Sequence, residues 1–193
     1  MATFLIDLSP RDMQRRLSDA LAIYVDAMRY PRGTEDHRAS MWMEHSRRKG
    51  WHGVAAVDAP GDDGPLVDAP MIGVAYGYCG APDQWWQQQV LQGMHRTGLA
   101  ASQIGSLMGS YFELTELHIH PRAQGRGLGE ALTRRLLAGR DEAYVLLSTP
   151  EIRGENNRAW RLYRRLGFAD IVRGHHFAGD PRAFAILGRT LPL

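Results

Sequence analysis

The segment RAQGRGLG at residues 122–129 constrains the fold most, because it stands between a strand pattern and a helix pattern. Residues 111–120 read as a strand. After the glycines, apolar residues recur on one face of a helix that extends through Arg140, at Ala131, Leu132, Leu136 and Leu137. When a glycine turn connects a strand to the start of a helix, several free backbone N–H groups point at one place and can bind an anion. A pyrophosphate is the natural ligand of such a site.

Each glycine of this loop has a physical reason to be there. Gly125, Gly127 and Gly129 permit a tight turn and close approach of phosphate oxygens, while the helix dipole and Arg126 add positive potential. A dinucleotide-binding loop has similar spacing, but it belongs near the start of a β-α-β unit with an acidic residue about 20 positions on, after the second strand. Here Glu142 precedes the next strand, which disfavours that alternative.

The remaining patterns predict one mixed α/β domain over residues 1–193. A strand at 4–8 ends at Ser9, which caps a helix up to Met28, and a more polar helix follows at 34–49. Strands at 53–58 and 71–79 flank an exposed turn at 59–70, forming an antiparallel hairpin. The further expectations are a helix at 82–98, a Gly/Ser-containing segment before the strand at 111–120, a strand at 144–148, a helix at 156–166, and strands near 168–172 and 182–188.

Composition and charge narrow the class of protein. The chain has 44% hydrophobic and 23% charged residues, as globular proteins do, and its formal charge of +2 supplies little attraction for nucleic acid. Cys79 is the only cysteine, which suits a reducing cytosol. The N-terminal sequence predicts neither a signal peptide nor a membrane-spanning helix. We therefore expect a cytoplasmic protein without membrane or nucleic-acid partners.

A second motif, ENNRAWRLYRRLGF at residues 155–168, shows helical spacing that stops at a glycine before a strand. With both motifs in order, the chain resembles the GNAT superfamily of N-acetyltransferases. The first GNAT motif, Q/R-x-x-G-x-G/A, is matched at Gln124, Gly127 and Gly129. The second motif, N-x-x-A-x-x-L-Y-x-x-x-G-F, is matched at Asn156, Ala159, Leu162, Tyr163, Gly167 and Phe168. The strand motif that precedes the glycine loop, L-x-V-x-P, is matched at Leu117, Ile119 and Pro121.

The resemblance implies an α/β (α+β) GNAT fold, in which a single mixed, mostly antiparallel sheet is splayed at the acyl-CoA site and flanked by about four or more helices. It also implies acetyl-CoA as the acyl donor, with its pantetheine along the strand and hydrogen-bonded to Asn156, and no metal. The residues expected to bind acetyl-CoA are Leu117, His118, Ile119, Gln124, Gly125, Arg126, Gly127, Leu128, Gly129, Asn156 and Tyr163. The connection STPEIRGEN before Asn156 is longer than the family's usual link.

Transfer to nitrogen requires a neutral amine, and an alkylamine with a pKa of about 10.4 is mostly protonated at neutral pH. A carboxylate base is therefore expected. Glu113 lies where several relatives place their base, with Glu116 second and Glu151 third; regular alternation puts Glu116 and His118 on one face of the strand. The resemblance makes Tyr163 the acid that protonates the departing thiolate, although it could also be a core aromatic.

Several alternatives stay open at this point. His118-x-His120 and His175-His176 are short of the three or four ligands that zinc requires. Trp85 and Trp86 fit an acceptor pocket or a packed helix equally well. The acceptor is a small amine or a protein amino group, and a homodimer is compatible with the family. The competing functions are a non-enzymatic acyl-CoA-binding regulatory domain and a nucleotide-binding module.

Overall fold

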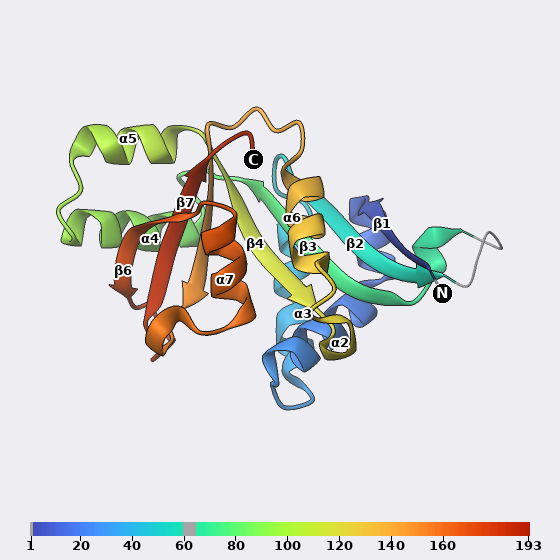
Figure 1. The fold of residues 1–193 in the computed structure, drawn as a ribbon. Helices are drawn as coiled ribbons and strands as arrows, with labels where there is room; N and C mark the ends of the chain where they lie inside the picture. The colour runs from blue at the N-terminus through green and yellow to red at the C-terminus, as the bar shows by residue number, and fades with distance from the viewer. Residues whose placement is uncertain (1, 60–64) are drawn as a thin grey trace. The chain divides into compact units, whose positions relative to one another are not determined.

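A computed structural model describes residues 2–59 and 65–193 of the chain (Figure 1). Residues 60–64 of the predicted turn at 59–70 lie outside the described residues. The strands are β1 (Ala2–Leu8), β2 (His52–Ala59), β3 (Met71–Cys79), β4 (Tyr111–Ile119), β5 (Tyr144–Pro150), β6 (Ala169–His175) and β7 (Phe184–Thr190). The helices are α1 (Pro10–Arg15), α2 (Leu17–Met28), α3 (Thr34–His45), α4 (Trp85–Arg96), α5 (Ala101–Gly109), α6 (Leu128–Leu137) and α7 (Arg158–Arg165).

The strands form a mixed sheet in the order β1-β2-β3-β4-β5-β7-β6. Strands β4 and β5 pair in parallel, whereas β1 with β2, β2 with β3, β5 with β7 and β6 with β7 pair antiparallel. The hairpin predicted from 53–58 and 71–79 is β2 and β3. This mixed, mostly antiparallel sheet with flanking helices confirms the predicted fold class.

Contacts divide the chain into two compact units, and β4 contributes to both. The first unit comprises residues 1–78 and 115–138, and the second comprises residues 79–114 and 139–193. The single domain over residues 1–193 stays a prediction.

In the first unit, the predicted cap at Ser9 is present. Its side chain accepts from the backbone N–H of Asp12, and the Asp12 carboxylate accepts from the backbone N–H of Ser9. The single helix predicted up to Met28 is wrong, because the chain breaks at Arg16 into α1 and α2. The buried Arg16 guanidinium donates to the carbonyls of Val67 and Ala69, a contact that local sequence does not reveal.

The two faces of β3 pack against different helices of the first unit. Val74 and Tyr76 join a core with α2 and α3. On the other face, a Cβ built on Gly73 would lie 3.2 Å from Leu132 of α6. Because successive side chains of β3 point to opposite faces, α2 and α3 pack on one face of this strand and α6 packs on the other.

The second unit contains α4, α5, β5, β6, β7, α7 and the first half of β4. The Gly/Ser-containing segment expected before the strand at 111–120 contains the helix α5, which the sequence patterns did not predict. Its buried Ile104 packs with Val90 and Met94 of α4 in the core of this unit. A close approach between α4 and β6 depends on Gly93, since a Cβ there would lie 2.7 Å from His175 Nδ1.

Candidate acetyl-CoA site

The glycine loop has the backbone conformation that a phosphate cradle requires. Gly125 and Gly127 have φ values of 81° and 78°, the left-handed region that favours glycine. Gly127 is the N-cap of α6, and Leu128 and Gly129 are the first two residues of this helix. The first backbone N–H groups of α6 therefore have no partner within the helix and point away from its N-terminal end. Apart from the adjacent residues of the chain, no described heavy atom lies within 4 Å of a Cβ built on Gly125 or Gly127. The loop therefore has open space beside these two glycines.

Side chains of the loop bind the strands around it. Gln124 Nε2 donates to the carbonyl of Ile119 at 3.1 Å, which ties the loop to the end of β4. Arg126 donates to Thr3 Oγ1 at 2.6 Å and lies 3.8 Å from the Asp58 carboxylate. The positive charge expected to face the phosphates is thus shared with an acidic side chain of β2.

Strand β4 carries the candidate bases in different environments. Glu113, in the second unit, is buried at 3% exposure. Glu116, in the first unit, accepts a hydrogen bond from or donates one to His118, with 2.5 Å between Oε2 and Nε2. This contact agrees with the prediction that Glu116 and His118 share a face. Leu117 and Ile119 on the same strand are half-buried.

The second motif forms the start of α7. The helix begins at Arg158, because Asn157 is its cap and accepts from the backbone N–H of Trp160 at 2.9 Å. The predicted start at Asn156 is therefore two residues early. Asn156 Oδ1 accepts from Arg161 at 2.9 Å. Tyr163 is 7% exposed, and its ring packs on Phe168 with centroids 5.7 Å apart.

The long connection before Asn156 is held by ion pairs that sequence reasoning missed. Arg164 contacts Glu155 and Asp170, each at 2.6 Å, and Arg173 contacts Glu151 at 2.7 Å and Glu155 at 3.0 Å. These hydrogen bonds from Arg173 lower the pKa of Glu151. A carboxylate held ionised by an arginine is a weak proton acceptor, which disfavours Glu151 as the base.

The histidine pairs of the sequence have other partners. His120 lies 3.5 Å from Asp26, and His175 Nδ1 contacts Arg96 at 3.2 Å. Across residues 2–59 and 65–193 there is no group of three or more His, Cys, Asp or Glu that could hold a metal. Within the same ranges, no helix combines the length and apolar character needed to cross a bilayer.

The two candidate acceptor tryptophans differ. Trp86 is buried and donates to Ser148 Oγ at 3.2 Å. Trp85 is 51% exposed and packs on Phe177, with ring centroids 5.6 Å apart. Only Trp85 is therefore free to meet another molecule.

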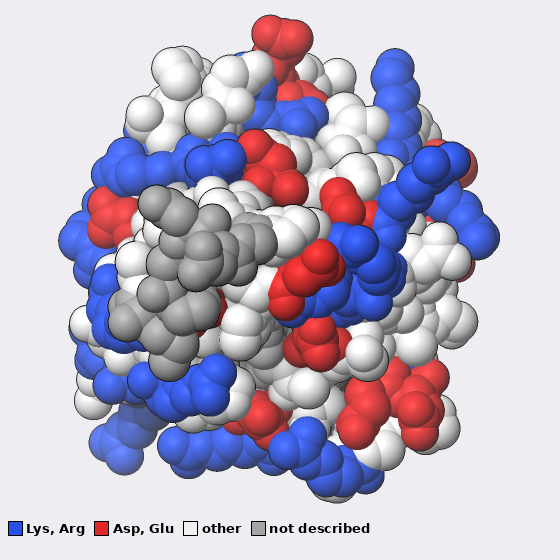
Figure 2. All heavy atoms as spheres, turned by 90° about the vertical axis from the view of Figure 1, so that its right-hand side faces the viewer, with Lys and Arg blue, Asp and Glu red and all other residues white. Residues whose placement is uncertain are grey.

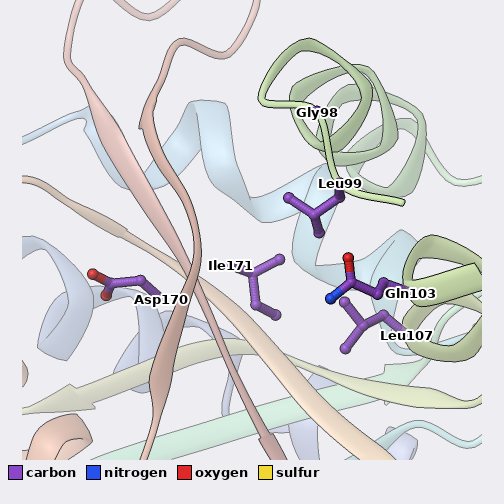
Figure 3. A pocket seen from close by; sticks show the side chains of 6 residues that line it. All are labelled: Gly98, Leu99, Gln103, Leu107, Asp170 and Ile171. Atoms are coloured by element: carbon purple, nitrogen blue, oxygen red, sulfur yellow. The ribbon is translucent and has the colours of Figure 1, made fainter. Parts of the chain in front are cut away.

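Two surface features accompany these motifs. A groove of about 380 Å³ in the second unit is lined by the turn after α4, by α5 and by β6. In Figure 3, Leu99, Gln103, Leu107 and Ile171 lie on one side of β6 and the Asp170 side chain on the other. On the face drawn in Figure 2, acidic and basic side chains are interspersed, so the described residues there give no field of a single sign.

Comparisons with known proteins agree with this fold. A family model described as "Acetyltransferase (GNAT) domain" matches residues 83–170. A GCN5-like protein acetyltransferase of Mycobacterium tuberculosis, Rv2170, is 69% identical over 206 residues, covering 100% of each chain. The chain belongs to the GNAT acetyltransferase family.

Solved structures share the fold at low identity. The crystal structure of Arabidopsis thaliana NAA60 in complex with acetyl-CoA has a TM-score of 0.63 and 18% identity, covering 98% of this chain and 99% of that one. The ribosomal-protein-S18-alanine N-acetyltransferase of Escherichia coli has a TM-score of 0.61 and 16% identity, covering 100% and 96%. These likenesses establish the fold.

Proposed function

We propose that this protein transfers the acetyl group of acetyl-CoA to a primary amine carried by a protein substrate. The observation that carries the proposal is the full-length 69% identity to a relative named as a protein acetyltransferase. A small-molecule amine is the alternative acceptor. We place the reaction in the cytoplasm, in one functional domain of residues 1–193.

The proposed chemistry is direct attack within a ternary complex. The N–H groups of residues 124–129 bind the pyrophosphate, and Leu117 to Ile119 with Asn156 bind the pantetheine arm. A carboxylate of β4 takes a proton from the acceptor ammonium, and the amine attacks the thioester carbonyl. The phenol of Tyr163 protonates the departing thiolate. The open, positive-φ glycine loop supports the first of these roles.

The test measures free thiol released when purified protein is mixed with acetyl-CoA and a panel of acceptors. The panel contains lysine-bearing peptides, peptides with free N-termini, polyamines and amino acids. We expect turnover with peptide acceptors, and mass spectrometry should find an acetyl group on an amino nitrogen. Acetyl-CoA binding without any acyl transfer would favour the non-enzymatic regulatory alternative.

A variant tests the acid. Tyr163→Phe removes only the hydroxyl and should lower kcat by about 100-fold, a typical loss for one general acid, while acetyl-CoA affinity stays close to wild type. Unchanged kcat would remove Tyr163 from the mechanism. Phe168→Leu, which changes the ring that Tyr163 packs on, is the control for disturbed packing.

A further inference from the structure

Glu116 and His118 of β4 form a coupled acid-base pair inside the first unit. Glu116 Oε2 and His118 Nε2 are 2.5 Å apart, and their side chains are 14% and 9% exposed. The two side chains therefore share a hydrogen bond, in which the role of the imidazole nitrogen depends on the tautomer of His118. The pair is thus screened from bulk water without being sealed from it.

Aromatic rings of two helices fix the imidazole. Tyr24 of α2 meets the His118 ring edge-on, with centroids 5.0 Å apart and an interplanar angle of 78°. Trp42 of α3 stacks on it, with centroids 6.3 Å apart and an angle of 18°. Because His118 is held between two rings, it in turn orients the Glu116 carboxylate.

The groups that face this pair are mostly neutral. Burial raises the pKa of Tyr24 to about 12, and burial lowers the pKa of His45 to about 4. Tyr76 of β3 accepts from or donates to His45 at 3.0 Å. The guanidinium of Arg38 on α3 lies 5.7 Å from the centroid of the Tyr24 ring. The remaining acidic and imidazole side chains on these elements are Asp19 and Asp26 of α2, Glu35, Asp36, His37 and Glu44 of α3, and Glu113 of β4.

Resting on the proposed function, we infer that Glu116, oriented by His118, accepts the proton of the acceptor ammonium, in place of Glu113. Glu113 is 3% exposed, whereas the Glu116 side chain is 14% exposed and hydrogen-bonds to the His118 ring. Glu116 is the catalytic residue in this scheme, and His118 is a positioning residue.

The atoms balance as follows. The acceptor ammonium gives one proton to Glu116, and the freed lone pair forms a bond to the carbonyl carbon. The carbon–sulfur bond then breaks, and the thiolate takes a proton from Tyr163. The second proton of the acylated nitrogen restores the phenol through water, and Glu116 releases its proton to solvent. The net change is one amide, one free thiol and one released proton.

The experiment compares Glu116→Gln with Glu113→Gln, using the best acceptor from the peptide panel. We expect Glu116→Gln to lower kcat by about 100-fold and to remove the acidic limb of the pH profile of kcat/KM. Glu113→Gln should change kcat by less than about 3-fold. Acetyl-CoA affinity, measured by calorimetry, should stay within about 3-fold of wild type in both variants. Glu116→Asp should restore part of the lost rate.

His118→Gln tests the positioning role. It should lower kcat and displace the acidic limb of the profile, and a purely structural role would not displace that limb. Wild-type kcat in Glu116→Gln, or an equal loss in Glu113→Gln, would overturn the inference and leave the proposed function intact. Absence of turnover by the wild type over the whole panel would instead overturn the proposed function.

Discussion

Replacing Gly127 by alanine isolates the role of the glycine loop, because the chain supplies a matched control. Gly127 has a φ of 78° and Gly98, in the turn after α4, has a φ of 77°. Apart from the adjacent residues of the chain, no described heavy atom lies within 4 Å of a Cβ built at either position. The two substitutions therefore impose the same backbone strain without a clash. They differ because only Gly127 lies in the loop that is proposed to bind the phosphates.

The expected magnitudes follow from this geometry. A non-glycine residue in the left-handed region costs about 1–2 kcal/mol, so both variants should melt at least about 2–4 °C below wild type. In Gly127→Ala the strained residue is also the N-cap of α6, whose first amides are proposed to bind the phosphates. Loss of one hydrogen bond to a charged phosphate costs about 1.5–3 kcal/mol, which corresponds to roughly 10-fold to 100-fold weaker acetyl-CoA binding.

Thermal melting and isothermal titration with acetyl-CoA separate the two effects. We expect similar losses of Tm in the two variants and weaker binding in Gly127→Ala alone. If Gly127→Ala bound acetyl-CoA as tightly as Gly98→Ala and wild type, the loop would not bind the phosphates. Weakening by the same factor in both variants would also refute the argument, since it would trace the loss to stability.

Two further predictions concern stability. Hydrogen bonds from Arg140 lower the pKa of Glu142 to about 2, so its contribution is present above pH 4.5 and is lost as the pH falls through 2. The unfolding free energies of wild type and Glu142→Gln, measured in urea, should differ by at most about 3 kcal/mol above pH 4.5, and this difference should shrink as the pH falls to 2. A difference that stays constant over this pH range would contradict the ion pair. Gly93→Ala should destabilise by about 1–3 kcal/mol through overlap with buried His175, while Gly105→Ala, in open space on α5, should be neutral or stabilising. Equal melting temperatures of these two alanine variants would disprove the close packing at Gly93.

The sequence predicts local features well, because their signals lie within a few residues. The cap at Ser9, the glycine loop and the strand-helix order of residues 111–166 are of this kind. Helix α5 was missed because glycine and serine obscure a short helical pattern. Ile104, Leu107 and Met108 recur at helical spacing and could have indicated it.

Other features depend on residues far apart in the chain. The break at Arg16 arises from carbonyls near residue 68, and the pairing of Arg173 with Glu151 spans two strands. The candidate site shows the same division. Its phosphate loop is a contiguous motif, whereas the choice between Glu113 and Glu116 depends on burial and on rings contributed by α2 and α3, which no spacing along β4 encodes.

The contact of Arg126 with Thr3 has a practical consequence for handling the protein. Thr3 also donates to Asp58 at 2.6 Å, so the second residue of β1 helps to set the side chain at the tip of the cofactor loop. An affinity tag fused ahead of this strand would crowd the loop, whereas one fused after Leu193 would leave that hydroxyl in place. Kinetic constants for the coenzyme are best compared on protein whose amino-terminal strand carries no added residues.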